Sequence, residues 1–273
     1  MTKTKAPAAP RLITPRRIAL ATVAGISVTH SYGVQDMFVG KAYAETASKA
    51  EAGEGGEAGE AGVVLSEGPA GFLTKLGYFE GTYRIAASLY LSGARDGAKA
   101  HLEESHHAFY EDIEDSLAEY KAIGFAREAE VFLAAVNEDK GNVAVTEAYD
   151  ALMTAIDGNI ISASPSGYDR LMSVHELIKL AAAEYEGGVT EGAVDIVIEY
   201  RDSWGFYETA RARAERLARG TDVSLAKAGA DVLAQLEGVE ALYPSLTSDT
   251  AAVDASQLSV AAGWAEIIAL RLK

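Results

Sequence analysis

Amphipathic helical periodicity, broken by short runs of turn-forming residues, constrains the fold of this chain most strongly. Beyond residue 68, apolar residues recur at the three- to four-residue spacing of helices, and pairs such as Ser92-Gly93 and Tyr243-Pro244 separate the segments. The predicted helices span residues 70–92, 95–121, 125–138, 143–157, 166–187, 191–219, 222–241 and 251–272. Because short loops favour antiparallel neighbours, we expect an all-α antiparallel helical bundle of about seven or eight helices, or two fused small bundles.

The N-terminal residues have the pattern of an export signal. Residues 1–17 are basic and lack acids, an apolar run from Ile18 to Val28 follows, and Ala42-Tyr43-Ala44 supplies an A-x-A site. We therefore expect residues 1–44 to be a signal peptide and the protein to be exported to the periplasm. An organellar transit peptide is the alternative, whereas about eleven apolar residues are too few for a membrane anchor.

The next segment is nearly all Glu, Ala and Gly up to Gly62. It carries like charges and no large apolar side chains, so residues 45–68 are predicted to be an acidic flexible linker. The helical-bundle domain is then expected to occupy residues 69–273.

The charge and the residue types exclude several classes of function. Acidic residues number 40 and basic residues 24, which gives a formal charge of −16 and disfavours nucleic acid as a partner. The absence of cysteine excludes disulfides, thiolate metal sites and thiol catalysis. The sequence also lacks a phosphate-binding glycine loop, a nucleophile elbow, a zincin motif and a dinucleotide fingerprint, so we do not expect an enzyme.

A histidine-rich, acidic stretch within the second predicted helix is the first candidate site. On a helical wheel His101, Glu104, His107 and Glu111 gather on one acidic face, and the spacings bring each histidine near a glutamate. Nitrogen and carboxylate ligands suit iron, copper or zinc. The alternative is a solvated surface without a bound metal.

His106 falls instead within the apolar arc of the same helix and is expected to point inward. His175 lies at the edge of an apolar arc in a later helix, so the pair could hold a metal ion or, as the lesser alternative, a haem iron between helices. Ordinary packing of buried histidines is the competing interpretation.

A second acidic site is predicted within residues 191–219. Glu199 and Asp202 share one side of this helix. We expect them to pair with arginines such as Arg201, Arg211 or Arg213, or to bind a cation or a partner.

The segment His101-Leu102-Glu103-Glu104 matches an H-x-x-E motif. With its leader and helical pattern, the chain resembles the exported imelysin-like proteins, helical bundles associated with iron uptake, over residues 70–273. The resemblance implies metal-related roles for His101 and Glu104. We therefore expect an exported protein that binds a metal ion or metal-containing cofactor for uptake, storage or delivery. The alternative is a non-enzymatic interaction or scaffold module that recruits a protein partner through its helical surface.

Overall fold

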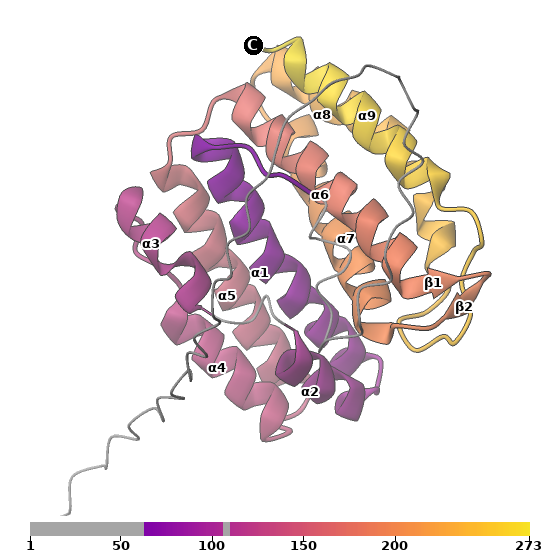
Figure 1. Cartoon of the computed structure of the whole chain (residues 1–273). Coiled ribbons are helices and arrows are strands. Elements are labelled where there is room, and N and C mark those ends of the chain that lie inside the picture. The colour runs from indigo at the N-terminus through magenta and orange to yellow at the C-terminus, as the bar shows by residue number, and fades with distance from the viewer. Residues whose placement is uncertain (1–62, 106–109) are drawn as a thin grey trace, which may run out of the picture. The chain divides into compact units, whose positions relative to one another are not determined.

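The computed structural model describes residues 63–105 and 110–273, and the predicted signal peptide and most of the predicted linker lie outside these ranges. Among the described residues the long elements are all helices, which confirms the all-α class and the helical bundle (Figure 1). They are α1 (Gly68–Leu91), α2 (Arg95–Glu104), α3 (Glu111–Glu119), α4 (Ala126–Asn137), α5 (Asn142–Ser162), α6 (Gly167–Gly188), α7 (Val197–Ala218), α8 (Val223–Gln235), a short 3-10 helix (Val239–Leu242) and α9 (Ser256–Leu270).

The helices surround two hydrophobic cores. The N-terminal half, α1 to α5, encloses one core of buried aliphatic and aromatic side chains that includes Leu76, Ile85 and Phe132. The C-terminal half, α6 to α9, encloses the other, with Leu177, Tyr200 and Val232. Helix α1 packs against α6 and α7 as well as against its own half, so it joins the two cores (Figure 1). Two small fused bundles therefore describe this part of the chain.

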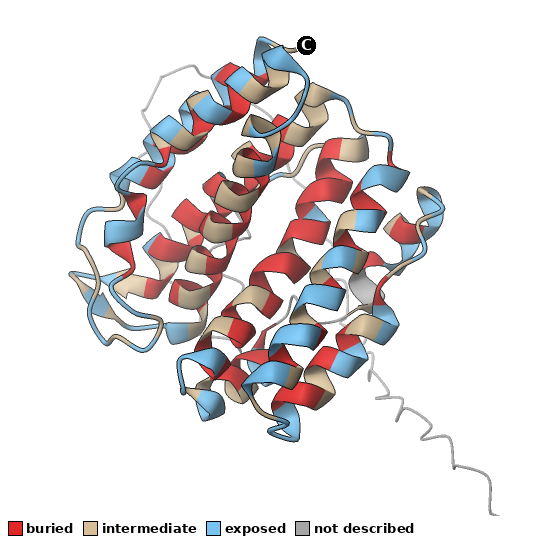
Figure 2. Cartoon of the chain, turned by 180° about the vertical axis from the view of Figure 1, so that it is seen from behind, coloured by how far each residue is buried: buried red, intermediate tan, exposed pale blue. Residues whose placement is uncertain are grey.

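The amphipathic pattern accounts for both cores. The long helices turn their apolar faces inward and leave polar residues outside, as the alternation of buried and exposed bands in Figure 2 shows. Helix α6 also begins with a capping box, in which the Ser166 hydroxyl accepts a hydrogen bond from the Asp169 amide and the Asp169 carboxylate accepts one from the Ser166 amide.

Buried tyrosines tie the long connection before α9 to the C-terminal core. The Tyr185 hydroxyl donates to the carbonyl of Ala252 at 2.9 Å, and the Tyr200 hydroxyl donates to that of Ser245 at 3.2 Å. The hydroxyls of Tyr243 and Ser203 lie 2.7 Å apart. The bonds from Tyr185 and Tyr200 satisfy backbone carbonyls of an irregular segment that packs on the bundle.

Glycine allows α1 and α7 to approach closely where the two halves meet. A Cβ atom built on Gly205 would lie 2.6 Å from the Ile85 side chain and 3.0 Å from the Gly81 carbonyl oxygen. A Cβ atom on Gly81 would lie 3.2 Å from the backbone of Gly205. A side chain at either position would therefore require the neighbouring backbone or the Ile85 side chain to shift.

Three predicted helices differ markedly from the structure. The helix predicted over residues 222–241 ends at Gln235, and a separate 3-10 helix follows Gly238. The single helix predicted over residues 95–121 ends at Glu104, because Ser105 is extended with ψ of 123°. The helix predicted from residue 191 begins at Val197, since β1 (Val189–Thr190) and β2 (Ala193–Val194) form an antiparallel hairpin before it. Its two turn residues, Glu191 and Gly192, both have positive φ, as a type I′ hairpin turn requires.

The last residues of the predicted linker lie against the C-terminal half. Val63 and Leu65 pack on its hydrophobic core. The amide of Ser66 donates to Oε1 of Glu176 at 2.7 Å, and the Thr74 hydroxyl donates to the other oxygen of this carboxylate. Glu176 thus fixes the point at which the chain enters α1.

Candidate functional site

The contact between α1 and α7 contains a buried ion pair. Nη2 of Arg213 lies 2.7 Å from Oε1 of Glu80, and the two side chains are 6% and 2% exposed. Arg213 also donates to the carbonyl of Leu73 at 2.7 Å and lies 3.4 Å from the Ser173 hydroxyl. A buried pair needs such additional hydrogen bonds, since removing two charges from water is costly.

The Glu80 carboxyl remains ionised in this setting. Burial alone would raise its pKa, but the charge and hydrogen bond of Arg213, together with the charges of Arg216 and Arg84, outweigh burial and hold the pKa below its ordinary value. Arg216 lies 3.7 Å from Oε2 of Glu80 and 3.0 Å from Asp157 on α5. Glu80 therefore faces two arginines of α7, and the second of these arginines reaches α5.

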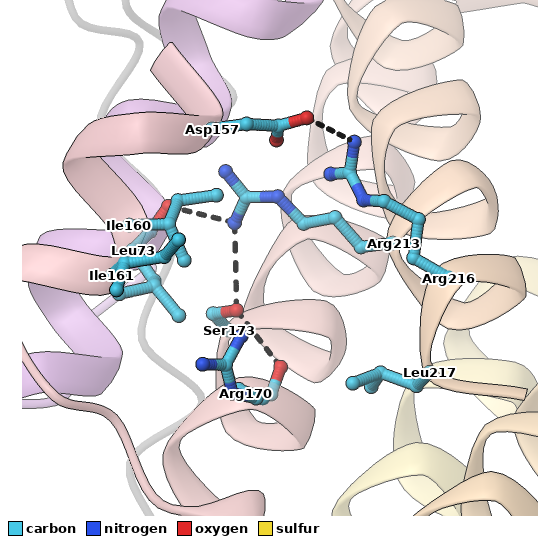
Figure 3. Close-up of a pocket in the computed structure, with 9 residues that line it drawn as sticks. All are labelled: Leu73, Asp157, Ile160, Ile161, Arg170, Ser173, Arg213, Arg216 and Leu217. Carbon is cyan, nitrogen blue, oxygen red and sulfur yellow. Dashed lines mark hydrogen bonds and ion pairs between the residues drawn. The ribbon is translucent and has the colours of Figure 1, made fainter. Parts of the chain in front are cut away.

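Next to this network lies a pocket of about 290 Å³ between α1, α5, α6 and α7 (Figure 3). Three arginines, Arg170, Arg213 and Arg216, line it together with one acid, Asp157. Leucine and isoleucine side chains form much of the remaining wall. The pocket thus combines cationic groups with an apolar surface.

Burial raises the pKa of the Asp157 carboxyl above its ordinary value, and the nearby charge of Arg216 offsets only part of this rise. The like charge of Glu80 acts in the same direction as burial. Because the arginines that surround Asp157 outnumber it, the charge of the pocket lining is positive.

A histidine and a carboxylate meet at a second buried position between the halves. Nε2 of His101 on α2 lies 3.6 Å from Oδ1 of Asp202 on α7, and the side chains are 0% and 6% exposed. His101 therefore does not lie on the solvated acidic face where the helical wheel placed it. Glu104, three residues later, is exposed, so the two residues of the H-x-x-E segment have different environments.

The other predicted ligands of this stretch cannot be placed in the same way. His106 and His107 lie outside the described residues, as does the side chain of Glu111. Their predicted roles as metal or cofactor ligands remain predictions.

His175 is half-buried on α6. Its Nδ1 donates a hydrogen bond to the carbonyl of Ala262 on α9, at 2.8 Å. This bond fixes the ring and leaves Nε2 as the nitrogen that could hold a ligand.

Among the described residues, no group of three or more histidine and acidic side chains is arranged to hold a metal ion. The His101–Asp202 pair offers two donors of a type that iron accepts, which alone is an incomplete ligand set. Burial raises the pKa values of tyrosines in the C-terminal core, to about 12 for Tyr200 and Tyr207. None of the described helices is both long and apolar enough to cross a membrane.

The acidic residues Glu199 and Asp202, predicted together on one side of what is now α7, do not share one set of partners. Asp202 faces His101, whereas the buried Glu199 packs against Gly187. Arg213 pairs with Glu80 of α1, and Arg211 pairs with Glu208 and Glu215 of its own helix. The sequence analysis did not single out Glu80, which is an isolated acid in an apolar helix. An ionisable residue among apolar ones is rarely buried without a partner, so this position could have indicated a buried ion pair.

Residues 162–268 match the family described as the iron permease-associated 4-helix bundle domain. The matched range begins at the end of α5 and ends within α9, so it contains the helices of the C-terminal half. No curated protein and no solved structure matches the chain. The match supports an iron-uptake-related helical family, and it gives no specific support to the imelysin-like one.

Proposed function

We propose that this protein is an exported, non-enzymatic component of iron uptake that binds iron and passes it on. The observation that carries the proposal is that the iron permease-associated match covers α6 to α9, which share one hydrophobic core. The similarity therefore concerns a complete structural unit of four helices. An iron-related role for this unit agrees with the expectation from residues alone that the chain handles a metal.

The chemistry of the chain is compatible with a cation as its cargo. A formal charge of −16 raises the local concentration of cations around the protein. We place the binding site around His101 and Asp202, which supply nitrogen and oxygen donors, with His107 and Glu111 as proposed further ligands. Copper or zinc would use the same donors, and haem held by His106 and His175 is the lesser alternative.

Metal analysis of the full chain tests the proposal. The protein is dialysed against Fe²⁺ without oxygen, or against a chelate of Fe³⁺, and its iron content and thermal stability are then measured. We expect stoichiometric iron and a higher melting temperature, because a ligand that binds only the folded state stabilises it. No retained iron and no stabilisation by added cations would overturn the binding role.

Three variants locate the site. His101→Gln and His107→Ala should each lower the retained iron, whereas Glu130→Gln, which removes an exposed acid from α4, should leave it unchanged. An equal loss in all three variants would indicate diffuse attraction to the acidic surface and would contradict a defined site.

The alternative function, recruitment of a protein partner, is favoured by one surface. The outer face of α9 exposes apolar side chains at helical spacing: Val260, Trp264, Ile267 and Leu270. An iron permease is the partner that the family match suggests for this face. If Trp264→Ser and Ile267→Ser abolished association with a permease while iron binding was absent, the recruiting role would replace the binding role.

A further inference from the structure

The arginine-lined pocket continues into a second hollow. The first pocket, of about 290 Å³, and a neighbouring one of about 260 Å³ share Arg170, Arg216 and Leu217. The second reaches Thr221 and Leu225 at the start of α8. We call the two hollows together the groove. Arg170 and Arg216 line both parts of it, and it extends from α1 and α5 to the start of α8.

The arginines differ in how far they are already neutralised. Arg213 is held by Glu80, and Arg216 by Asp157. Arg170 forms no ion pair with any residue that the structure describes. Within the same described part, Nε of the buried Arg213 has no hydrogen-bond partner. The guanidinium group of Arg170 and Nε of Arg213 are thus cationic donors without an acidic or hydrogen-bonding partner among the described residues. Such donors are unusual in a chain with a formal charge of −16.

Apolar side chains line the groove beside these donors. Leu73, Ile160 and Ile161 form one end of the first pocket, and Leu217 lies opposite Arg170 (Figure 3). Ile161 is 69% exposed, so a bound molecule could cover surface that now faces water. A small inorganic anion would satisfy the arginines but leave this wall in contact with water.

We infer that the groove binds a small organic carboxylate, whose charged head pairs with Arg170 while its apolar body covers Ile161 and Leu217. The planar guanidinium group matches a carboxylate through two parallel hydrogen bonds. The apolar wall favours a hydrocarbon body. Asp157 in the lining of the first hollow and Asp222 in that of the second disfavour a second negative charge on the ligand. This site is separate from His101 and Asp202 and does not depend on the proposed role in iron uptake.

Calorimetric titration of the full chain tests the inference with hexanoate and benzoate as probes. Acetate and phosphate are controls that carry a negative charge but little or no hydrocarbon. Hexanol is a control that carries the hydrocarbon chain without a charge. We expect saturable binding of hexanoate and benzoate that is at least about tenfold tighter than that of the other three probes. No saturable binding of either probe, or equal binding of acetate or phosphate, would overturn the inference.

Arg170→Gln should weaken hexanoate binding by about tenfold, because the variant loses a charge-assisted hydrogen bond. The matched control is Arg211→Gln, which removes the same charge from α7 at a position paired with Glu208 and Glu215. The control should bind normally. Ile161→Ser, an exposed change that leaves folding intact, should weaken hexanoate binding and leave acetate unaffected. Equal losses in Arg170→Gln and Arg211→Gln would contradict a site at Arg170.

Discussion

Arg213 of α7 reaches Glu80 of α1 across the contact between the two halves, with Nη2 and Oε1 2.7 Å apart. The two residues are separated by 133 positions in the sequence, and both are buried. Their pairing fixes the alignment of α1 on α7, because neither charge can be left in the apolar interior alone. The adjacent pocket derives its positive charge from Arg213 and Arg216 of the same helix and from Arg170 of α6.

Breaking this pair should destabilise the protein strongly. Glu80→Ala leaves the Arg213 charge buried without its partner, so we expect a loss of about 3–5 kcal/mol in the free energy of unfolding, measured by urea denaturation. Arg211→Ala removes two partly exposed ion pairs within α7 and should cost about 0–1 kcal/mol. If Glu80→Ala cost no more than Arg211→Ala, the buried pair would not support the contact.

The glycine crossing of α1 and α7 should be intolerant of a side chain. Gly205→Ala places a methyl group against Ile85 and the Gly81 carbonyl, and overpacking of this kind costs about 1–3 kcal/mol. The matched control is Gly158→Ala in α5, where an added Cβ meets nothing within 4 Å. This control should stabilise the helix by about 0.5–1 kcal/mol, so thermal unfolding of the two variants should shift in opposite directions. A shift in the same direction would be unexpected.

Glu199 should make stability depend on pH with a sign opposite to that of Glu80. Burial raises the pKa of Glu199 in the folded protein, so the folded state keeps a proton that the unfolded state loses above about pH 4.5. The contribution of Glu199 to the free energy of unfolding therefore falls as the pH rises from about 4.5 to the pKa of the folded state. Glu80 has a lowered pKa, so its contribution is present above 4.5 and is lost as pH falls.

Glu199→Gln tests that sign, because glutamine mimics the protonated acid. The variant should unfold at a higher urea concentration than the natural protein at pH 7, and the difference should shrink below pH 4.5. Glu130→Gln, an exposed change on α4, should alter stability little at either pH. A Glu199→Gln variant that is less stable at pH 7 would show that the native state needs the ionised carboxylate.

The spacing of apolar residues and the positions of turn-forming residues were sufficient to predict most helices, because both features are determined by residues a few positions apart in the sequence. It failed where distant contacts or turn geometry dominate. The helix predicted to continue past Glu104 ends there, and the Ser105 hydroxyl lies 3.3 Å from that of Thr82 on α1. The Glu191-Gly192 turn was overlooked because two-residue strands carry too little periodicity to be distinguished from a helix start.

The site was harder to predict than the fold. A wheel assigns a residue to one face of its own helix but does not show what covers that face, and His101 is buried by α7 through Asp202. The arginine pocket brings together Arg170, Arg213 and Asp157 from three helices. No spacing along the chain relates these positions, so only the packed structure places them side by side.

Uptake of radioactive iron by the cells that produce this protein tests its proposed function most directly. Cells that lack the chain should accumulate iron more slowly at low external concentrations, and the natural chain should restore the rate. A chain carrying His101→Gln and His107→Ala should not restore it, whereas Glu130→Gln should. Equal uptake with and without the chain, at every iron concentration tested, would contradict a role in iron uptake.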